Sequence, residues 1–269
     1  MEHKSAVPPP SVSKRRRRAL CGIGMATLTV ALIVSAVSFA LAETTAFPDV
    51  PNTHPYHSAI TDLASRGVVS GYTDGTFGPG DEIKRQQFAK MIVLAGGYPV
   101  SESDICPFTD VEVSGPATFF PDNYVAVCAA EGITLGKTAT AFDPYTSITR
   151  LQVISMVVRA ADDLRPDLLA TPPDGWEGTS GWDLDATHGA NAARAEYNGL
   201  LAGLEISTLA PNGNMTRGEV AQVLFNLLTK IAPPATTTTT AGSSTTTTTA
   251  ASTTTTTAAS TTTTTGTGS

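Results

Sequence analysis

Three arginines stand at equivalent places before apolar stretches of this sequence, where their chemistry would suit an anion. Arg85, Arg150 and Arg217 are 65 and 67 residues apart, and each begins a predicted helix. A cation in the first turn opposes the helix dipole and costs roughly 0.3–1 kcal/mol. Beside free helix amides, however, a guanidinium can hold a carboxylate through two parallel hydrogen bonds. The residues favour equally an anion receptor and an ion pair with a neighbouring acidic side chain.

Other residues suited to chemistry are few. Beyond residue 42 the histidines are His54, His57 and His188, and Pro55 interrupts the first two, so a helical zinc pair is not expected. Neither a Gly-x-Ser-x-Gly elbow nor a phosphate loop occurs. We therefore predict a non-catalytic protein without catalytic residues, metal or cofactor. A surface enzyme with an unrecognised site stays an alternative.

The arginines belong to an internal repeat. Seven positions recur after 65 residues and again after a further 67, which indicates three diverged copies of one unit. The matched sets are Gly67, Gly71, Phe77, Pro79, Ile83, Arg85 and Met91; Gly132, Gly136, Phe142, Pro144, Ile148, Arg150 and Met156; and Gly199, Gly203, Leu209, Pro211, Met215, Arg217 and Val223.

Each copy is predicted to form a helix, a loop and a second helix. In the first copy Ile60 and Leu63 form an apolar stripe that ends at Gly67, a residue suited to a left-handed helix end. Asp74 and Gly75 signal a turn before the second helix. One unit buries too little surface to be stable alone, so we expect a mainly α fold in which the three copies share a core.

At the start of the second helix, the residues that cap the helix can be distinguished from a residue that could bind a ligand. Thr216 and Glu219 have the spacing of a capping box, in which each side chain bonds a backbone amide of the other residue. Capping accounts for the threonine and the glutamate but leaves the intervening Arg217 without a helical role.

The repeat resembles a known family. Phe-Pro-Asp-Val at 47–50, Gly-Val-Val-Ser-Gly-Tyr-Thr-Asp-Gly-Thr-Phe at 67–77, and His54, Tyr56 and Pro79 resemble the S-layer homology repeat. Thr-Arg-Gly-Glu at 216–219 is similar to the family's Thr-Arg-Ala-Glu signature. The resemblance extends over residues 47–231, fullest in the first copy. It implies a pseudo-threefold prism that binds anionic, often pyruvylated, secondary cell-wall polysaccharide without covalent attachment.

The resemblance also implies binding residues in grooves between the copies. Its signature arginine, here Arg85, Arg150 and Arg217, would contact the carboxylate of the ligand. Lys84 beside Arg85 favours the grooves that contain the first copy. The remaining candidates are Asp49 and Asp110, for which capping is an equal alternative, and Tyr56. For Tyr56 packing as a buried amphipathic aromatic is favoured over stacking on a sugar.

The ends of the chain differ in composition from its middle. Residues 1–42 combine five consecutive basic residues, an apolar run and Ala-Leu-Ala, which predicts a cleaved signal peptide; an uncleaved membrane anchor is the alternative. Residues 233–269 are nearly all Thr, Ser, Ala and Gly and predict a disordered stalk, a candidate for O-linked glycans. The copies occupy 43–107, 108–161 and 162–232, the last with an inserted loop holding Trp176 and Trp182, whose favoured role is packing.

Charge and cysteines narrow the expected partners. Without residues 1–42 the chain keeps 11 basic against 23 acidic residues, a balance that argues against nucleic acid. In an exported chain the pair Cys106 and Cys128 predicts a disulfide. We therefore expect a secreted protein of the cell wall or cell surface that binds an anionic wall polysaccharide. A purely structural stalk protein is a further alternative.

Overall fold

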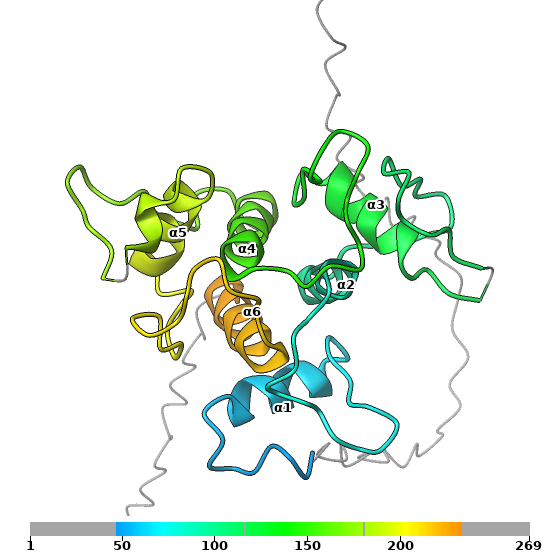
Figure 1. Cartoon of the computed structure of the whole chain (residues 1–269), viewed down its shortest axis with the longest axis horizontal. Coiled ribbons are helices and arrows are strands. Elements are labelled where there is room, and N and C mark those ends of the chain that lie inside the picture. Colours follow the sequence, from blue (N-terminus) through cyan, green and yellow to red (C-terminus); the bar gives the residue numbers. More distant parts are fainter. Residues whose placement is uncertain (1–46, 116, 180, 233–269) are drawn as a thin grey trace, which may run out of the picture. The chain divides into compact units, whose positions relative to one another are not determined.

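A computed structural model describes residues 47–115, 117–179 and 181–232 (Figure 1). The predicted signal peptide and Thr-rich stalk lie outside these described residues. The helices are α1 (His57–Ser65), α2 (Arg85–Gly96), α3 (Asp122–Ala130), α4 (Arg150–Leu164), the short 3-10 helix η1 (Trp182–Leu184), α5 (Gly189–Tyr197) and α6 (Arg217–Ile231). The described residues contain isolated β-bridges but no sheet, which confirms the mainly α prediction.

The second helix of each copy packs against the first helix of the next copy. Thus α2 contacts α3, α4 contacts α5, and α6 contacts α1, while α2, α4 and α6 also contact one another. Figure 1 shows these three longer helices near the centre, with α3, α5 and α1 outside them. The buried apolar side chains of all three copies belong to one hydrophobic cluster, so the copies share a core.

A closed circuit of backbone hydrogen bonds links the three copies just before their second helices. Ile83 N donates to Met215 O (3.1 Å), Met215 N to Ile148 O (2.9 Å), and Ile148 N to Ile83 O (2.9 Å). The side chains of all three residues are fully buried. Because each copy supplies a donor to one neighbour and an acceptor to the other, no copy completes its own pairing.

The helix starts and ends follow local rules. Thr216 Oγ1 accepts from Glu219 N (3.3 Å) and Glu219 Oε2 accepts from Thr216 N (3.0 Å), which confirms the capping box. In the first copy Gln87 Oε1 accepts from the Lys84 amide (2.9 Å). Gly67 follows α1 with a φ of 70°, the left-handed conformation that a Cβ would disfavour.

The inserted loop of the third copy is anchored by one of its tryptophans. Trp182, in η1 against α5, is only 1% exposed, which confirms packing as its role. Trp176 is half-buried and meets Tyr197 of α5 edge to face, with 5.8 Å between ring centroids.

The predicted disulfide is wrong, because Cys106 and Cys128 are both free thiols. Cys128 lies on the fully buried face of α3, where its Sγ is 3.5 Å from Ala89 O of α2. Cys106 lies in the loop that leads to Phe108. Burial raises the pKa of the Cys128 thiol, so this residue behaves as a small apolar core side chain. An even number of cysteines carries no information about which way each side chain faces.

None of the helices in the described ranges combines the length and the apolar character that crossing a membrane requires.

Candidate functional site

Arg85 connects the start of α2 to the second copy. Its Nε donates to Phe142 O (2.8 Å) and its Nη1 to Gln152 Oε1 (3.0 Å). The guanidinium also lies over the Phe142 ring, 4.8 Å from the centroid. The residue is only 4% exposed. These contacts give Arg85 a structural role at the junction between the first and second copies.

Arg150 forms an ion pair with an acidic residue of a neighbouring copy, which is one of the two alternatives predicted from the sequence. Its Nη2 and Nε donate to the two carboxylate oxygens of Glu219, at 2.8 and 3.1 Å, and its Nη1 donates to Ala210 O at 3.1 Å. Both charged side chains are buried. The bidentate face of this guanidinium, which a ligand carboxylate would need, is therefore occupied by Glu219.

Arg217 closes the junction between the third and first copies. Its Nε donates to Phe77 O and its Nη2 to Ser70 O, both at 2.8 Å. The guanidinium also lies 4.9 Å from the Tyr72 ring centroid and 4.5 Å from that of Phe77. Each of the three signature arginines thus binds main-chain oxygen of a neighbouring copy.

Asp49 and Asp110 hold the loops to which Arg217 and Arg85 bind. The two carboxylate oxygens of Asp49 accept from Phe77 N (2.8 Å) and Gly78 N (2.7 Å). Asp110 accepts in the same way from Phe142 N (2.8 Å) and Asp143 N (2.7 Å). Burial acts to raise the pKa of Asp49, but the amide hydrogen bonds outweigh it and the pKa is lowered. Both carboxylates act as loop caps.

Tyr56 lies just before α1 and against the start of α6. A Cβ at Gly218 would come within 2.7 Å of Tyr56 Cδ2, so glycine makes room for the ring. Burial, followed by the charge of Glu219, raises the pKa of Tyr56. The half-buried phenol therefore packs between α1 and α6, as expected for an amphipathic aromatic.

Lys84 and Lys90 of the α2 region differ from the three arginines because both are exposed. The Lys84 Nζ lies 5.9 Å from the Tyr145 ring centroid. The Lys90 Nζ lies 5.8 Å from the Phe120 centroid and 5.7 Å from that of Tyr124. Within the described residues neither ammonium has an ion pair. We call these five residues, Lys84, Lys90, Phe120, Tyr124 and Tyr145, the lysine–aromatic surface.

The packing of α2 explains why this surface faces solvent. Phe88, Ala89 and Ile92 on its inner side are fully buried, whereas Lys84, Gln87 and Lys90 recur every three residues on its outer side. The spacing of the lysines is visible in the sequence, but only Lys84 stands beside a signature arginine and was predicted to bind. The rings come from α3, from the loop before α3 and from the loop before α4, and no local pattern places them beside the lysines.

Comparison with known proteins identifies the family of the first copy, which contains Lys84. A family model of the S-layer homology domain matches residues 46–89. Residues 46–89 are an S-layer homology domain. The S-layer protein of Bacillus licheniformis is 29% identical over 211 residues, which cover 77% of this chain and 22% of the relative. The chain is a cell-surface protein, as its sequence predicts.

Two relatives with enzyme names share the same kind of partial match. An endoglucanase of Bacillus sp. is 30% identical over 225 residues, covering 81% of this chain and 23% of the relative. An uncharacterized cell wall amidase of Bacillus anthracis is 28% identical over 189 residues, covering 68% and 32%. The chain therefore spans between about a fifth and a third of the length of these relatives.

The three copies present different side chains at the position of Lys90, which directly follows the matched range 46–89. The repeat spacing places Ser155 in α4 and Gln222 in α6 there. Ser155 is fully buried and its Oγ lies 2.8 Å from His188 Nδ1, before α5. The Gln222 amide donates to Asn226 Oδ1 (2.9 Å). Among the three helix pairs, α2 with α3 alone has a lysine at this position.

His188 makes the pairing of α4 with α5 sensitive to pH. Burial lowers its pKa; Asp185 opposes this, while Arg159 and Arg85 add to it. Because the unfolded chain then binds the proton more readily, stability is full above the ordinary pKa of about 6.5 and declines as the pH falls below it. We expect His188→Asn to flatten the decline, measured as the free energy of urea unfolding between about pH 5 and pH 8. An unchanged slope in His188→Asn, with the matched variant His54→Asn as control, would contradict this assignment.

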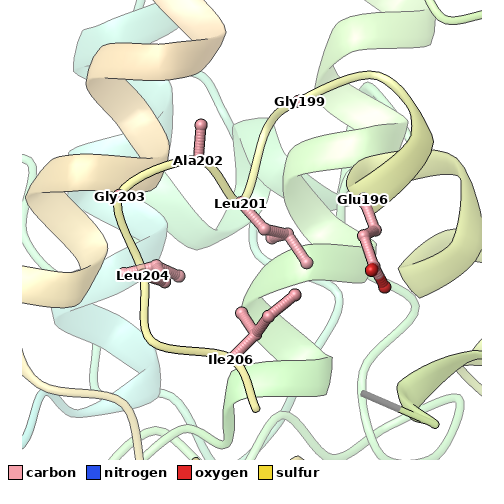
Figure 2. Close-up of a pocket in the computed structure, with 7 residues that line it drawn as sticks. All are labelled: Glu196, Gly199, Leu201, Ala202, Gly203, Leu204 and Ile206. Carbon is pink, nitrogen blue, oxygen red and sulfur yellow. The ribbon is translucent and has the colours of Figure 1, made fainter. Parts of the chain in front are cut away.

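A cavity of about 300 Å³ lies beside the end of α5 and is unsuited to an anion. Its lining comprises Glu196, Gly199, Leu201, Ala202, Gly203, Leu204 and Ile206. Figure 2 shows the aliphatic side chains of Leu201, Leu204 and Ile206 around it, with Glu196 as the one charged group. A carboxylate in an otherwise aliphatic wall would repel a second negative charge.

Proposed function

We propose that this chain attaches to an anionic polysaccharide of the cell wall, without covalent linkage, and that the lysine–aromatic surface is the point of attachment. The observation that carries the proposal is the combination of two exposed ammonium groups without ion pairs and three neighbouring rings. An ammonium group attracts a carboxylate, and an aromatic face packs on the apolar face of a sugar ring.

The charge of the whole chain makes local cations necessary. The 11 basic and 23 acidic residues that follow residue 42 would repel an anionic polymer over most of the surface. Most basic side chains of the described region are engaged, as in the pairs Arg66–Asp62, Lys137–Asp143 and Arg194–Asp162. Lys84 and Lys90 are therefore the cations best placed to receive a negatively charged ligand.

We assign the signature arginines a supporting role in this binding. Arg85, Arg150 and Arg217 already donate to groups of neighbouring copies, and Asp49 and Asp110 hold the loops they bind. Through these contacts Arg85 and Asp110 fix the loop that carries Tyr145 beside α2, whereas Arg150, Arg217 and Asp49 hold loops of the third and first copies. Tyr56 belongs to the α1–α6 pair and is likewise proposed to act through packing.

Several finer features belong to the same proposal. The three copies would form the pseudo-threefold prism of the family, a notion supported by the hydrogen-bond circuit of Ile83, Ile148 and Met215. The ligand would be a pyruvylated secondary wall polymer, and residues 1–42 and 233–269 would serve export and spacing from the wall. The role would be non-catalytic, since relatives named as an S-layer protein, an endoglucanase and an amidase share this part of the chain.

Co-sedimentation of the full chain with purified cell walls tests the attachment. We expect saturable binding that disappears after the secondary polymers are stripped from the walls. The double variant Lys84→Gln, Lys90→Gln should weaken binding by at least about tenfold, because two charge-assisted contacts are lost. The substitutions are at exposed positions and should leave unfolding unchanged.

Lys230→Gln is the matched control, because it removes the same charge from α6, away from the rings of the lysine–aromatic surface. It should bind walls like the unmodified chain. Wall binding by the double variant at full affinity would refute the lysine–aromatic surface as the attachment point. Absence of binding by the folded, unmodified chain would refute the function itself.

A further inference from the structure

The two lysines of the lysine–aromatic surface form separate contact points. Lys84, just before α2, is next to Tyr145, which comes from the loop preceding α4. Lys90, in the middle of α2, is next to Phe120, which precedes α3, and to Tyr124 in the first turn of α3. We call the first pair of residues the N-terminal station and the second group the central station. Each station combines one ammonium group with at least one ring.

The distance between the stations is set by the helix. Six residues of α-helix correspond to about 9 Å along the axis, and the two side chains leave the helix roughly 120° apart. The two ammonium groups contact different rings, Lys84 that of Tyr145 and Lys90 those of Phe120 and Tyr124, so they point in different directions. One carboxylate, whose oxygens are only about 2 Å apart, therefore contacts one station at a time.

The backbone that carries the stations is held firmly. Phe88, Ala89 and Ile92 on the opposite side of α2 are fully buried in the shared core. The Tyr145 hydroxyl donates to Glu112 Oε2 (3.0 Å), which orients the ring of the N-terminal station. A spacing fixed by a buried helix and by a tethered ring persists whether or not a ligand is present.

The surface between the stations suits a neutral sugar. Gln87 lies between the two lysines and is exposed, and its Oε1 accepts from the Lys84 amide (2.9 Å). Its amide nitrogen donates no hydrogen bond to any other group in the described part of the chain, so it is placed to donate to a hydroxyl. A glutamine between two lysines offers hydrogen bonding without a third charge.

We infer that the ligand is a linear polysaccharide that carries carboxylates at intervals, with neutral sugar between them, and that the two stations bind successive carboxylates of one chain. This inference rests on the proposed function and makes it more specific. It distinguishes a repeating charge along the polymer from a single charge at its end. Binding both stations makes the second contact intramolecular, so it raises affinity well beyond that of either contact alone.

The test uses fragments of the wall polymer from the organism that makes the protein. The polymer is partially hydrolysed and separated into fragments with one and with two carboxylates, and each is titrated calorimetrically into the full chain. We expect the fragment with two carboxylates to bind at least about tenfold more tightly. Lys84→Gln and Lys90→Gln should each reduce the affinity for the two-carboxylate fragment to that for the single-carboxylate fragment. The affinity for the single-carboxylate fragment should change by no more than about twofold in either variant.

Lys90→Arg keeps the positive charge and should retain the tighter binding, whereas Lys230→Gln should change neither affinity. Equal affinity for the two kinds of fragment, or a polymer that binds fully with a single terminal carboxylate, would overturn the two-station inference. Either result would leave wall attachment intact. If the folded chain bound neither the fragments nor the whole polymer, wall attachment itself would fail.

Discussion

Replacing Arg150 by methionine should lower the free energy of unfolding by about 3–5 kcal/mol, because it leaves the Glu219 carboxylate buried without its partner. The two side chains are 10% and 6% exposed, so water cannot replace the missing guanidinium. Glu219 also accepts from the Thr216 amide that starts α6. The pair therefore joins the second copy to the third at a helix start, and urea unfolding at neutral pH measures its loss.

The matched control is Arg66→Met on α1, which breaks an exposed pair with Asp62 and should cost less than about 1 kcal/mol. The combined variant Arg150→Met, Glu219→Met should recover part of the loss, since no buried charge then remains unpaired. Arg150→Met that unfolds normally but no longer binds cell walls would show that Arg150 contacts the ligand.

Trp182→Ala should lower the free energy of unfolding by about 3–5 kcal/mol, because it removes a fully buried ring and leaves a cavity. The ring holds the inserted loop of the third copy to α5. The chain contains two tryptophans, so each single variant retains one fluorescent reporter for urea unfolding.

Trp176→Ala is the comparison for this effect. Trp176 is half-buried, and within the described residues Tyr197 is the one aromatic ring that it contacts. Its loss should therefore cost about 1 kcal/mol. Costs of equal size for the two variants would contradict the distinction between a core tryptophan and a peripheral one. Wall binding should persist in folded Trp182→Ala, because the lysine–aromatic surface belongs to the first and second copies.

The local features of the fold were predictable because they depend on residues close in sequence. The capping box of Thr216 and Glu219 involves residues three positions apart, and Gly67 ends α1 through its own backbone conformation. The repeat spacing predicted the positions of the second helices and a core shared by the three copies. Resemblance to the S-layer homology repeat was confirmed over residues 46–89.

The contacts of the candidate site were less accessible to sequence reasoning. Arg85 and Phe142 are 57 residues apart, Arg150 and Glu219 are 69 apart, and Arg217 and Phe77 are 140 apart. No periodicity links such partners, because they meet only when the helix of one copy packs against the loop of another. The sequence left the arginines open between binding an anion and joining the copies, and the described structure engages all three within the protein.

The cysteines and the lysines illustrate the same limit. The even number of cysteines and the expected export of the chain predicted a disulfide, but the packing of α3 on α2 buries Cys128 against Ala89. Lys90 was an unremarkable charge in the sequence until α3 and the preceding loop placed Tyr124 and Phe120 beside it. The sequence by itself determined the repeat, the helices and their caps, since these follow from interactions over a few residues. The tertiary structure decided which cations stay available to a ligand, since that depends on partners from other copies.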